Sequence, residues 1–312
     1  MSEAVTGSLR EDVVARLRRS GCVFAEEEAD LLLAATPDGA AREELVRRRV
    51  AGEPLEHLLG WAEFGDLRVA VRPGVFVPRR RTLLLARLAE TALARAERTV
   101  HTRPVTVLEM CCGVGAITAR LTARSAASPR AAASPPRLIA ADIDPDAVAC
   151  ARLNAPDALV VEGDLFAALP ADLAGTIDVV VANAPYVPTA AIGSMPPEAR
   201  DHEHRVALDG GDDGLDVHRR IAAEVGPWLA PGGTVIVETS VRQAPTSAAL
   251  FRAAGLHTRV VRDERVEGTA VVGRTRHRST DGAAREHAAG PTTDSARREA
   301  GRPHDGAATG AA

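Results

Sequence analysis

Hydrophobic and polar positions alternate along the middle of the chain in a rhythm typical of strands that alternate with helices. Short apolar runs of the kind buried in a parallel sheet recur from about residue 105, and amphipathic stretches separate them. The predicted strands are 105–109, 138–142, 177–183 and 234–238, with one more before 162, and the predicted helices are 115–124, 145–153, 214–229 and 244–254. This rhythm predicts an α/β fold with a doubly wound sheet. Segments 258–263 and 269–273 predict a hairpin at the sheet edge.

The N-terminal segment has the periodicity of a small helical unit. Ser8 and Glu11 form a capping-box pattern, and apolar residues follow at helical spacing until Gly21. Two further helices are predicted over about 25–35 and 40–50. We therefore expect a separate helical domain ahead of the sheet.

A β-hairpin is expected between the helical unit and the sheet, because apolar residues alternate over 67–77 around Arg72-Pro73-Gly74. The low-complexity stretch 125–137 predicts a long loop. The 40 residues 273–312 contain no apolar side chain larger than Ala, which predicts a disordered tail. The expected organisation is a helical domain over 1–60, a hairpin linker over 61–82, an α/β domain over 83–274 and a tail over 275–312.

Composition and charge exclude several classes of protein. The chain is 46% hydrophobic and 26% charged, with a net charge of −4, as in an ordinary globular protein. No apolar run approaches the roughly 20 residues of a membrane span, and the first residues lack a secretory pattern, so we expect a cytoplasmic protein. Four cysteines without a C-x-x-C pair predict no disulfide framework or zinc site. With 3% aromatic residues, a nucleic-acid partner is not expected.

A glycine turn follows the first strand of the α/β region. The run Glu109-Met110-Cys111-Cys112-Gly113-Val114-Gly115 leads directly into a helix. Such a turn lets the backbone approach a ligand, and the helix N-terminus offers free N–H groups. A tight strand-to-helix turn without a ligand has the same pattern. Thr118 stands where a dinucleotide fingerprint has its third glycine, which counts against a nicotinamide oxidoreductase.

Carboxylates follow the next two strands. Asp142 ends the second strand, where a carboxylate can accept both hydroxyls of a ribose bound over the glycine turn. Asp144 is more simply the N-cap of the next helix, with Pro145 at its first position. Asp164 follows the third strand and can meet an adenine amine, although a loop Asp also caps turns.

The run Asn183-Ala184-Pro185-Tyr186-Val187-Pro188 leaves a buried strand and enters a rigid polar turn. Open α/β sheets bind ligands at this edge. The Asn183 side-chain oxygen and a nearby backbone carbonyl can together accept both hydrogens of a planar –NH₂ group, while Tyr186 packs against a flat group. The alternative is a structural turn in which the Asn bonds its own backbone.

Together these segments resemble the class I S-adenosylmethionine-dependent methyltransferases, and within them the protein N5-glutamine methyltransferases that modify peptide-chain release factors. The family signature Asn-Pro-Pro-Tyr stands here as Asn183-Ala184-Pro185-Tyr186, and the resemblance covers about 52–274. The other matching segments are Gly52-Glu53-Pro54, 73–79, 207–211 with 213–215, and 229–233 before Glu238.

The resemblance implies a mostly parallel seven-stranded sheet, S-adenosylmethionine as the cofactor, and no metal ion. It implies methylation of a glutamine N5 in a protein substrate such as a release factor. The residues implied for the cofactor are Glu109, Cys111, Gly113, Gly115, Asp142, Asp164, Leu165 and Asn183. Those implied for the substrate or for catalysis are Arg79, Asn183, Ala184, Pro185 and Tyr186.

Three departures from the family pattern stand out. Cys111 replaces the first glycine of the cofactor loop and restricts the backbone, and Ala184 replaces the first proline of the signature but keeps its carbonyl. Arg79-Arg80-Arg81-Thr82-Leu83 stands where the family has Arg-Pro-acid-Thr-acid, which exchanges negative for positive charge. These departures indicate a divergent branch whose target can differ.

Two other functions compete. The exocyclic amine of adenine is also planar and conjugated, so an N6-adenine nucleic-acid methyltransferase fits the same turn, although the charge and the low aromatic content count against it. A non-catalytic S-adenosylmethionine-binding protein would explain Cys111 and Ala184, although Asn183, Pro185 and Tyr186 are retained.

Taken by themselves, without the resemblance, two clusters of charged or ligating residues indicate no site. His202 and His204 have H-x-H spacing without an obvious third ligand, so no metal is predicted. The Arg79-Arg80-Arg81 cluster is interpreted as solvated, with an acidic partner or RNA as the alternative.

Overall fold

The computed structural model describes residues 3–127 and 134–275. Its centre is a seven-stranded sheet in the order β5-β4-β3-β6-β7-β9-β8. The strands are β3 (Thr106–Met110), β4 (Arg137–Asp142), β5 (Leu159–Glu162), β6 (Ile177–Ala182), β7 (Leu229–Glu238), β8 (His257–Asp263) and β9 (Gly268–Arg274). The first five pair in parallel, whereas β9 is antiparallel to β7 and β8. The predicted doubly wound sheet and its edge hairpin are confirmed.

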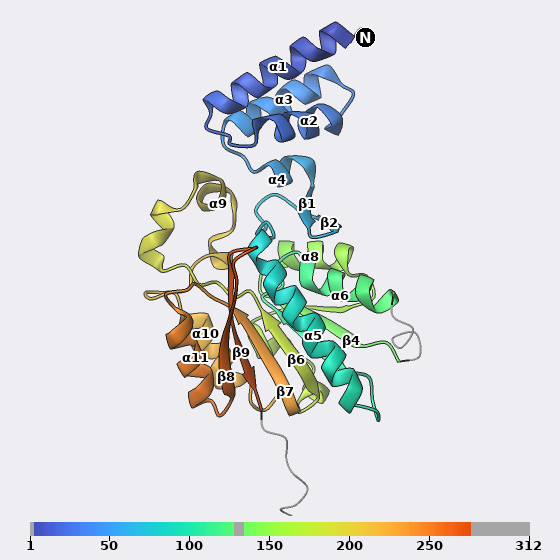
Figure 1. Cartoon of the computed structure of the whole chain (residues 1–312), viewed down its shortest axis with the longest axis vertical. Coiled ribbons are helices and arrows are strands. Elements are labelled where there is room, and N and C mark those ends of the chain that lie inside the picture. The colour runs from blue at the N-terminus through green and yellow to red at the C-terminus, as the bar shows by residue number, and fades with distance from the viewer. Residues whose placement is uncertain (1–2, 128–133, 276–312) are drawn as a thin grey trace, which may run out of the picture. The chain divides into compact units, whose positions relative to one another are not determined.

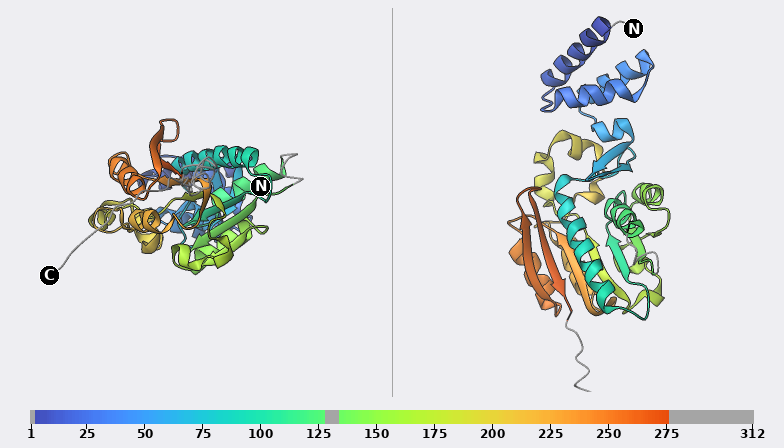
Figure 2. Two further views of the ribbon diagram at one scale, coloured as in Figure 1. Left: turned by 90° about the horizontal axis from the view of Figure 1, so that it is seen from below. Right: turned by 45° about the vertical axis from the view of Figure 1, so that its right-hand side comes forward.

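Helices cover both faces of the sheet, because successive strand residues point to opposite sides. Val179 and Val181 of β6 pack in one hydrophobic cluster with α5, α6 and α8, whereas Val180 and Ala182 pack in another with α10 and α11. Figures 1 and 2 show α5 lying across the strands on the first face. The helices are α5 (Leu83–Thr99), α6 (Ala116–Ala126), α8 (Pro145–Asn154), α10 (Asp216–Glu224) and α11 (Ala244–Ala253).

The N-terminal segment forms the predicted helices around a cluster of its own that includes Val13, Leu17, Leu32 and Val46. The helices are α1 (Glu3–Arg19), α2 (Ala25–Ala35), α3 (Gly39–Val50) and α4 (Leu55–Leu59). The predicted capping box at Ser8 is wrong, because α1 begins five residues earlier, at Glu3.

The predicted hairpin lies closer to the N-terminus than expected. Its strands are β1 (Trp61–Phe64) and β2 (Leu67–Ala70), so the chain turns at Gly65 and Asp66 rather than at Arg72-Pro73-Gly74. Gly65 has φ +68°, which explains the turn position. The division into domains at 60, 82 and 274 stays a prediction.

Shorter elements connect the sheet to the site. They are the 3₁₀ turns η1 (Arg80–Thr82), η2 (Leu165–Ala168), η3 (Ala171–Leu173), η4 (Thr189–Ser194) and η5 (Arg205–Ala207), and the helix α9 (Pro197–His202). The predicted tail lies outside the described residues from 276 onward, as does the centre of the predicted loop at 128–133. No helix in the described part of the chain is long and apolar enough to cross a membrane.

Candidate active site

A pocket opens where the carboxyl ends of β3, β4 and β6 meet, the edge at which open α/β sheets bind ligands. It gathers all but one of the residues that the sequence predicts for the site, although they are spread over more than 100 positions. The predicted residues that line it are Arg79, Glu109, Cys111, Gly113, Asp142, Asp164, Leu165, Asn183, Ala184, Pro185 and Tyr186.

The glycine turn is fixed to the neighbouring strand by Asp142. One carboxylate oxygen accepts from the Gly113 N–H at 2.8 Å, and the other accepts from the Asp144 N–H at 3.0 Å. Burial raises the pKa of Asp142, while these backbone hydrogen bonds lower it. Each oxygen keeps lone-pair capacity for a further donor, so the carboxylate can hold the loop and accept ligand hydroxyls at once.

Cys111 and Gly113 both have left-handed backbone, with φ of +54° and +53°. This conformation costs a residue with a Cβ atom about 1–2 kcal/mol relative to glycine. Cys111, which stands where the family pattern has glycine, therefore carries local backbone strain.

Gly115, the remaining predicted residue, lies behind the pocket wall at the start of α6 with φ +73°. A Cβ atom here would lie 3.0 Å from the Cβ of Ala151 and 3.2 Å from its Cα. The glycine therefore allows α6 and α8 to approach each other. Its predicted contact with a cofactor stays a prediction.

Glu109 is buried at the end of β3, and its carboxylate faces the first turn of α6. It accepts from the backbone N–H groups of Ile117 at 3.3 Å and Thr118 at 2.7 Å, and from the Thr118 hydroxyl at 2.5 Å. Burial raises the pKa of Glu109 to about 7, although the Thr118 and Ile117 hydrogen bonds oppose the shift. The side chain thus satisfies the free N–H groups of the helix, and its predicted role in cofactor binding stays a prediction.

Two further acidic residues stand on this side of the pocket. Asp164 is about half-exposed and pairs with Arg220 at 2.8 Å, and the Leu165 that follows it has φ +46°. Asp144 caps α8 as predicted, accepting from the Asp146 N–H at 2.9 Å, and its other oxygen lies 2.6 Å from Nδ1 of His204. Asp144, Asp146 and His204 offer ligand atoms within 4.8 Å of one another, a proximity that the cap and this hydrogen bond explain.

Asn183 directly follows β6, and its side chain is held from one end. Its Nδ2 donates to Oγ1 of Thr82 at 3.2 Å, whereas its Oδ1 accepts no side-chain or turn hydrogen bond within residues 3–127 and 134–275. Over the same residues, no turn or side-chain hydrogen bond is made to the carbonyl of the buried Ala184. Two consecutive residues thus each offer an acceptor that no turn or side-chain donor in the described part of the chain occupies, and both residues line the pocket.

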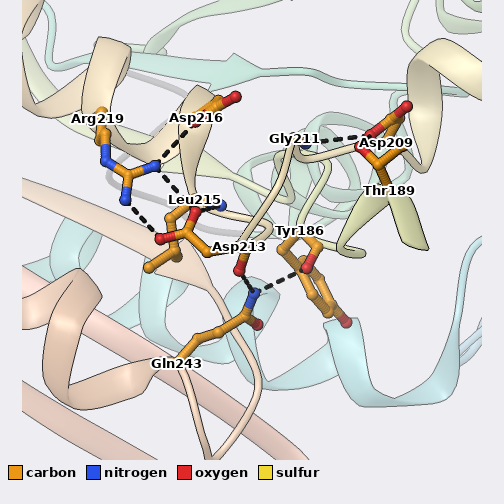
Figure 3. A network of polar contacts seen from close by, with 9 residues as sticks. All are labelled: Tyr186, Thr189, Asp209, Gly211, Asp213, Leu215, Asp216, Arg219 and Gln243. Atoms are coloured by element: carbon orange, nitrogen blue, oxygen red, sulfur yellow. Dashed lines mark hydrogen bonds and ion pairs between the residues drawn. The ribbon is translucent and has the colours of Figure 1, made fainter. Parts of the chain in front are cut away.

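Tyr186 is held at both ends. Its hydroxyl donates to Oε1 of Glu238 at 3.0 Å, and its backbone carbonyl accepts from Nε2 of Gln243 at 2.9 Å, as Figure 3 shows for the second contact. Burial and the nearby Glu238 carboxylate raise the pKa of the Tyr186 hydroxyl well above its usual range. The neutral phenol is therefore a fixed wall of the pocket.

The expectation of a solvated Arg79-Arg80-Arg81 cluster is wrong for Arg79, which is partly buried, whereas Arg81 is exposed as expected but also forms an ion pair. Arg79 pairs with Glu203 at 2.5 Å, and Arg81 pairs with Glu238 at 3.2 Å while its guanidinium lies 5.9 Å from the centre of the Tyr186 ring. Arg80 is exposed as expected, and the buried carboxylates of Glu203 and Glu238 pair with the other two guanidinium groups.

Three residues at the site were assigned no role from the sequence. Thr82 and Glu238 were noted only as parts of family segments, and Gln243 was not noted. Each of the three lies far from Asn183 along the chain. The only feature of the local sequence that could have indicated a site residue is a polar residue at the end of an apolar run. This feature marks Glu238, after the apolar strand 234–238, more clearly than the other two.

The chain is similar in sequence to known methyltransferases. No protein-family model matches the chain. The chain is 36% identical, over 81% of its length and 92% of the relative, to a release factor glutamine methyltransferase from Deinococcus radiodurans. It is 35% identical, over 67% of its length and 69% of the relative, to the 4-amino-L-phenylalanine/4-methylamino-L-phenylalanine methyltransferase of Streptomyces pristinaespiralis. A solved release-factor-specific protein-(glutamine-N5) methyltransferase from Alicyclobacillus acidocaldarius matches with a TM-score of 0.36 and 22% identity over 64% of this chain and 94% of that one.

Proposed function

Because the chain belongs to the family of release factor glutamine methyltransferases, we propose that it methylates the side-chain N5 of a glutamine in a release factor. The methyl donor is S-adenosylmethionine. The observation that carries the proposal is the pair of free acceptors at Asn183 Oδ1 and the Ala184 carbonyl, which face no other donor in the described part of the chain. The proposal includes a cytoplasmic location, where translation factors act.

The cofactor side of the pocket fits S-adenosylmethionine. The Asp142 carboxylate has capacity for the two ribose hydroxyls, and the loop at Gly113 brings backbone close to a ligand. Asp164 and Leu165 line the same pocket, and we propose that they contact the adenine. When bound, S-adenosylmethionine supplies a methyl carbon activated by the adjacent sulfonium.

On the substrate side, the chain's own residues position the nitrogen. An amide nitrogen is a poor nucleophile because its lone pair is delocalised into the carbonyl. If Asn183 Oδ1 and the Ala184 carbonyl accept both N–H groups, the lone pair is directed at the methyl carbon while Tyr186 packs against the amide plane. The N–C bond forms as the S–C bond breaks, and the nitrogen then releases a proton to solvent. Positioning of this kind can supply about 7–11 kcal/mol of the barrier.

The test is single-turnover methylation of a purified release factor with radiolabelled S-adenosylmethionine, and it compares Asn183→Ala with Asp142→Ala. We expect Asn183→Ala to lower the transfer rate at saturating cofactor about a hundredfold with unchanged cofactor affinity. We expect Asp142→Ala to weaken cofactor binding by roughly 1.5–3 kcal/mol, the cost of a charge-assisted hydrogen bond. Calorimetry measures the affinities.

Two control substrates separate the alternatives. Free 4-amino-L-phenylalanine tests an aromatic amine, and adenine-containing DNA tests a nucleic-acid target. Transfer to either of these but not to the release factor would overturn the proposed substrate, and a parent rate for Asn183→Ala would remove the assigned role of the turn.

A further inference from the structure

A chain of polar contacts runs from Asn183 back into the protein. The side-chain nitrogen of Asn183 donates to the Thr82 hydroxyl oxygen at 3.2 Å, and Thr82 is only 5% exposed. The Thr82 hydroxyl also lies near the carboxylate of Glu238, the last residue of β7, and lowers its pKa, although no hydrogen bond of standard geometry joins the two side chains. One buried hydroxyl thus lies between Asn183 and Glu238.

Glu238 accepts hydrogen bonds from several sides. It is 1% exposed, and its Oε1 accepts from the Tyr186 hydroxyl at 3.0 Å and from Nε of Arg81 at 3.2 Å. Its Oε2 is buried without a hydrogen-bond partner of standard geometry in the described part of the chain. Burial raises the pKa of Glu238, while Thr82, Arg81 and Tyr186 lower it by stabilising the anion. A buried carboxylate oxygen that lacks a donor, beside a hydroxyl, makes Glu238 the acceptor for the Thr82 proton.

The direction of these contacts sets the orientation of the Asn183 amide. A hydroxyl has one proton, so a Thr82 hydroxyl that donates to Glu238 can only accept from Asn183. Nδ2 must then face Thr82, and Oδ1 faces the pocket. If the Asn183 amide were flipped, Oδ1 would face the Thr82 oxygen, and two acceptors would lie together with no proton between them. The –NH₂ group would face the N–H groups of a substrate amide, and two donors would lie together.

We propose that Thr82 and Glu238 are positioning residues, which fix the Asn183 side chain with its oxygen toward the methyl-accepting nitrogen. The inference rests on the proposed function, because it assigns Asn183 Oδ1 the role of substrate acceptor. The same carboxylate also fixes the Tyr186 hydroxyl, so one buried group orders both side chains of the turn.

The experiment compares the Thr82→Val and Thr82→Ser variants with the unmodified protein. It measures the single-turnover rate of release factor methylation at saturating S-adenosylmethionine. Thr82→Val keeps the shape but has no hydroxyl, so the Asn183 side chain loses the hydrogen bond that fixes its position and orientation. We expect a fall of about tenfold in the maximal rate, the effect of one lost hydrogen bond, with unchanged cofactor affinity. Thr82→Ser restores most of the rate because it keeps the hydroxyl. Thr91→Val, at an exposed threonine of α5, controls for loss of a hydroxyl elsewhere.

The decisive measurement repeats Thr82→Val in the Asn183→Ala background. If Thr82 acts only through the Asn183 amide, the second substitution lowers the rate no further. An equal fall in both backgrounds, or a parent rate for Thr82→Val, overturns the inference while the proposed function stands. Absence of release factor methylation by the unmodified protein overturns the proposed function, and the inference with it.

Glu238→Gln provides a second route if Thr82→Val does not fold. The amide introduced by this substitution can donate as well as accept, so it no longer forces the Thr82 proton away from Asn183. The rate should fall at least as far as in Thr82→Val. The fall should be smaller in the Asn183→Ala background, where only the contact of Glu238 with Tyr186 is left to be disturbed. A parent rate for Glu238→Gln contradicts the inference.

Discussion

The two sides of the pocket are held in place by different kinds of contact. On the cofactor side, the key contacts are made by backbone: Asp142 is held by the N–H groups of Gly113 and Asp144. On the substrate side, Asn183 and Tyr186 are held by the side chains of Thr82 and Glu238, which come from distant segments. The first side therefore depends on the conformation of one loop, whereas the second depends on the identity and direction of individual side-chain donors.

Two buried glutamates show the contrast at the ends of β3 and β7. Glu109 accepts two backbone N–H groups and one hydroxyl, all from α6. Glu238 accepts from a phenol and a guanidinium that belong to separate elements. Burial raises the pKa of both, but only Glu238 has an arginine beside it that lowers its pKa. We therefore expect the glutamate without a cation to influence stability most strongly as pH changes.

The largest expected effect is on the pH dependence of stability in Glu109→Gln. The pKa of Glu109 is about 7 in the folded protein against 4.5 for the free side chain, so the folded state holds the proton more tightly. Its contribution to stability is complete below about pH 4.5 and is lost as pH rises toward 7. The loss is about 3 kcal/mol, since each pKa unit corresponds to about 1.4 kcal/mol. The amide in the variant does not titrate, so urea unfolding should show Glu109→Gln gaining stability relative to the parent between pH 5 and 7.

Glu238→Gln in the same assay is the matched control, because its carboxylate has the Arg81 guanidinium beside it. We expect a smaller pH-dependent difference from the parent. If the difference in unfolding free energy from the parent changed equally with pH in both variants, the arginine beside Glu238 would have no effect. The contrast between the two glutamates would then be wrong.

The cofactor side was largely predictable because its determinants are local in sequence. Gly113, Asp142 and the Asp144 cap each follow a recognisable apolar strand, and the parallel sheet brings strand ends together. The strands β3, β4 and β6 and the helices α6 and α8 were predicted within a few residues, whereas α9, which follows β6, was not predicted. A glycine turn and a carboxylate at adjacent strand ends need only this topology.

The substrate side was predicted only as far as its own turn. Asn183 and Tyr186 were recognised, but Thr82 is 101 positions from Asn183, and nothing near it in the sequence indicates their contact. Helix α5, which begins at Leu83 and carries the preceding Thr82 into the site, was not predicted, although Leu84, Leu85, Ala89 and Leu93 are spaced for a buried face. The ion pairs of Arg79 and Arg81 depend on buried glutamates that only the folded chain brings to them.

A second expected effect separates two glycines of the same turn. Gly115→Ala adds a Cβ atom 3.0 Å from Ala151 in left-handed backbone, whereas Gly113→Ala has the same backbone strain with no atom within 4 Å. We expect Gly115→Ala to lower the free energy of unfolding by about 2–3 kcal/mol and Gly113→Ala by about 1 kcal/mol. Equal losses in urea unfolding would mean that packing of α6 on α8 does not require the glycine.

The smallest expected effect concerns Gln243, which holds the backbone of the substrate-side turn. Ser240 donates to its Oε1 at 2.6 Å, so Nε2 faces the carbonyls of Tyr186 and Asp213 at 2.9 Å each (Figure 3). Gln243→Met keeps the length but removes both donors. Because Asp213 is exposed and water can replace that bond, we expect a loss of only about 1 kcal/mol in unfolding free energy.

Gln243→Met should affect the methyl-transfer rate and the cofactor affinity differently, because Gln243 contacts the substrate side of the pocket. Tyr186 follows Asn183 by three residues, so a loosened Tyr186 carbonyl disturbs the placement of the turn, whereas Asp142 and Gly113 keep their backbone contacts. The single-turnover rate should therefore fall severalfold while calorimetry gives the parent affinity for S-adenosylmethionine. If Gln243→Met lowered the affinity for S-adenosylmethionine in proportion to the rate, the two sides of the pocket would be coupled through β6 and β7. The distinction between a side held by backbone and a side held by side chains would then be wrong.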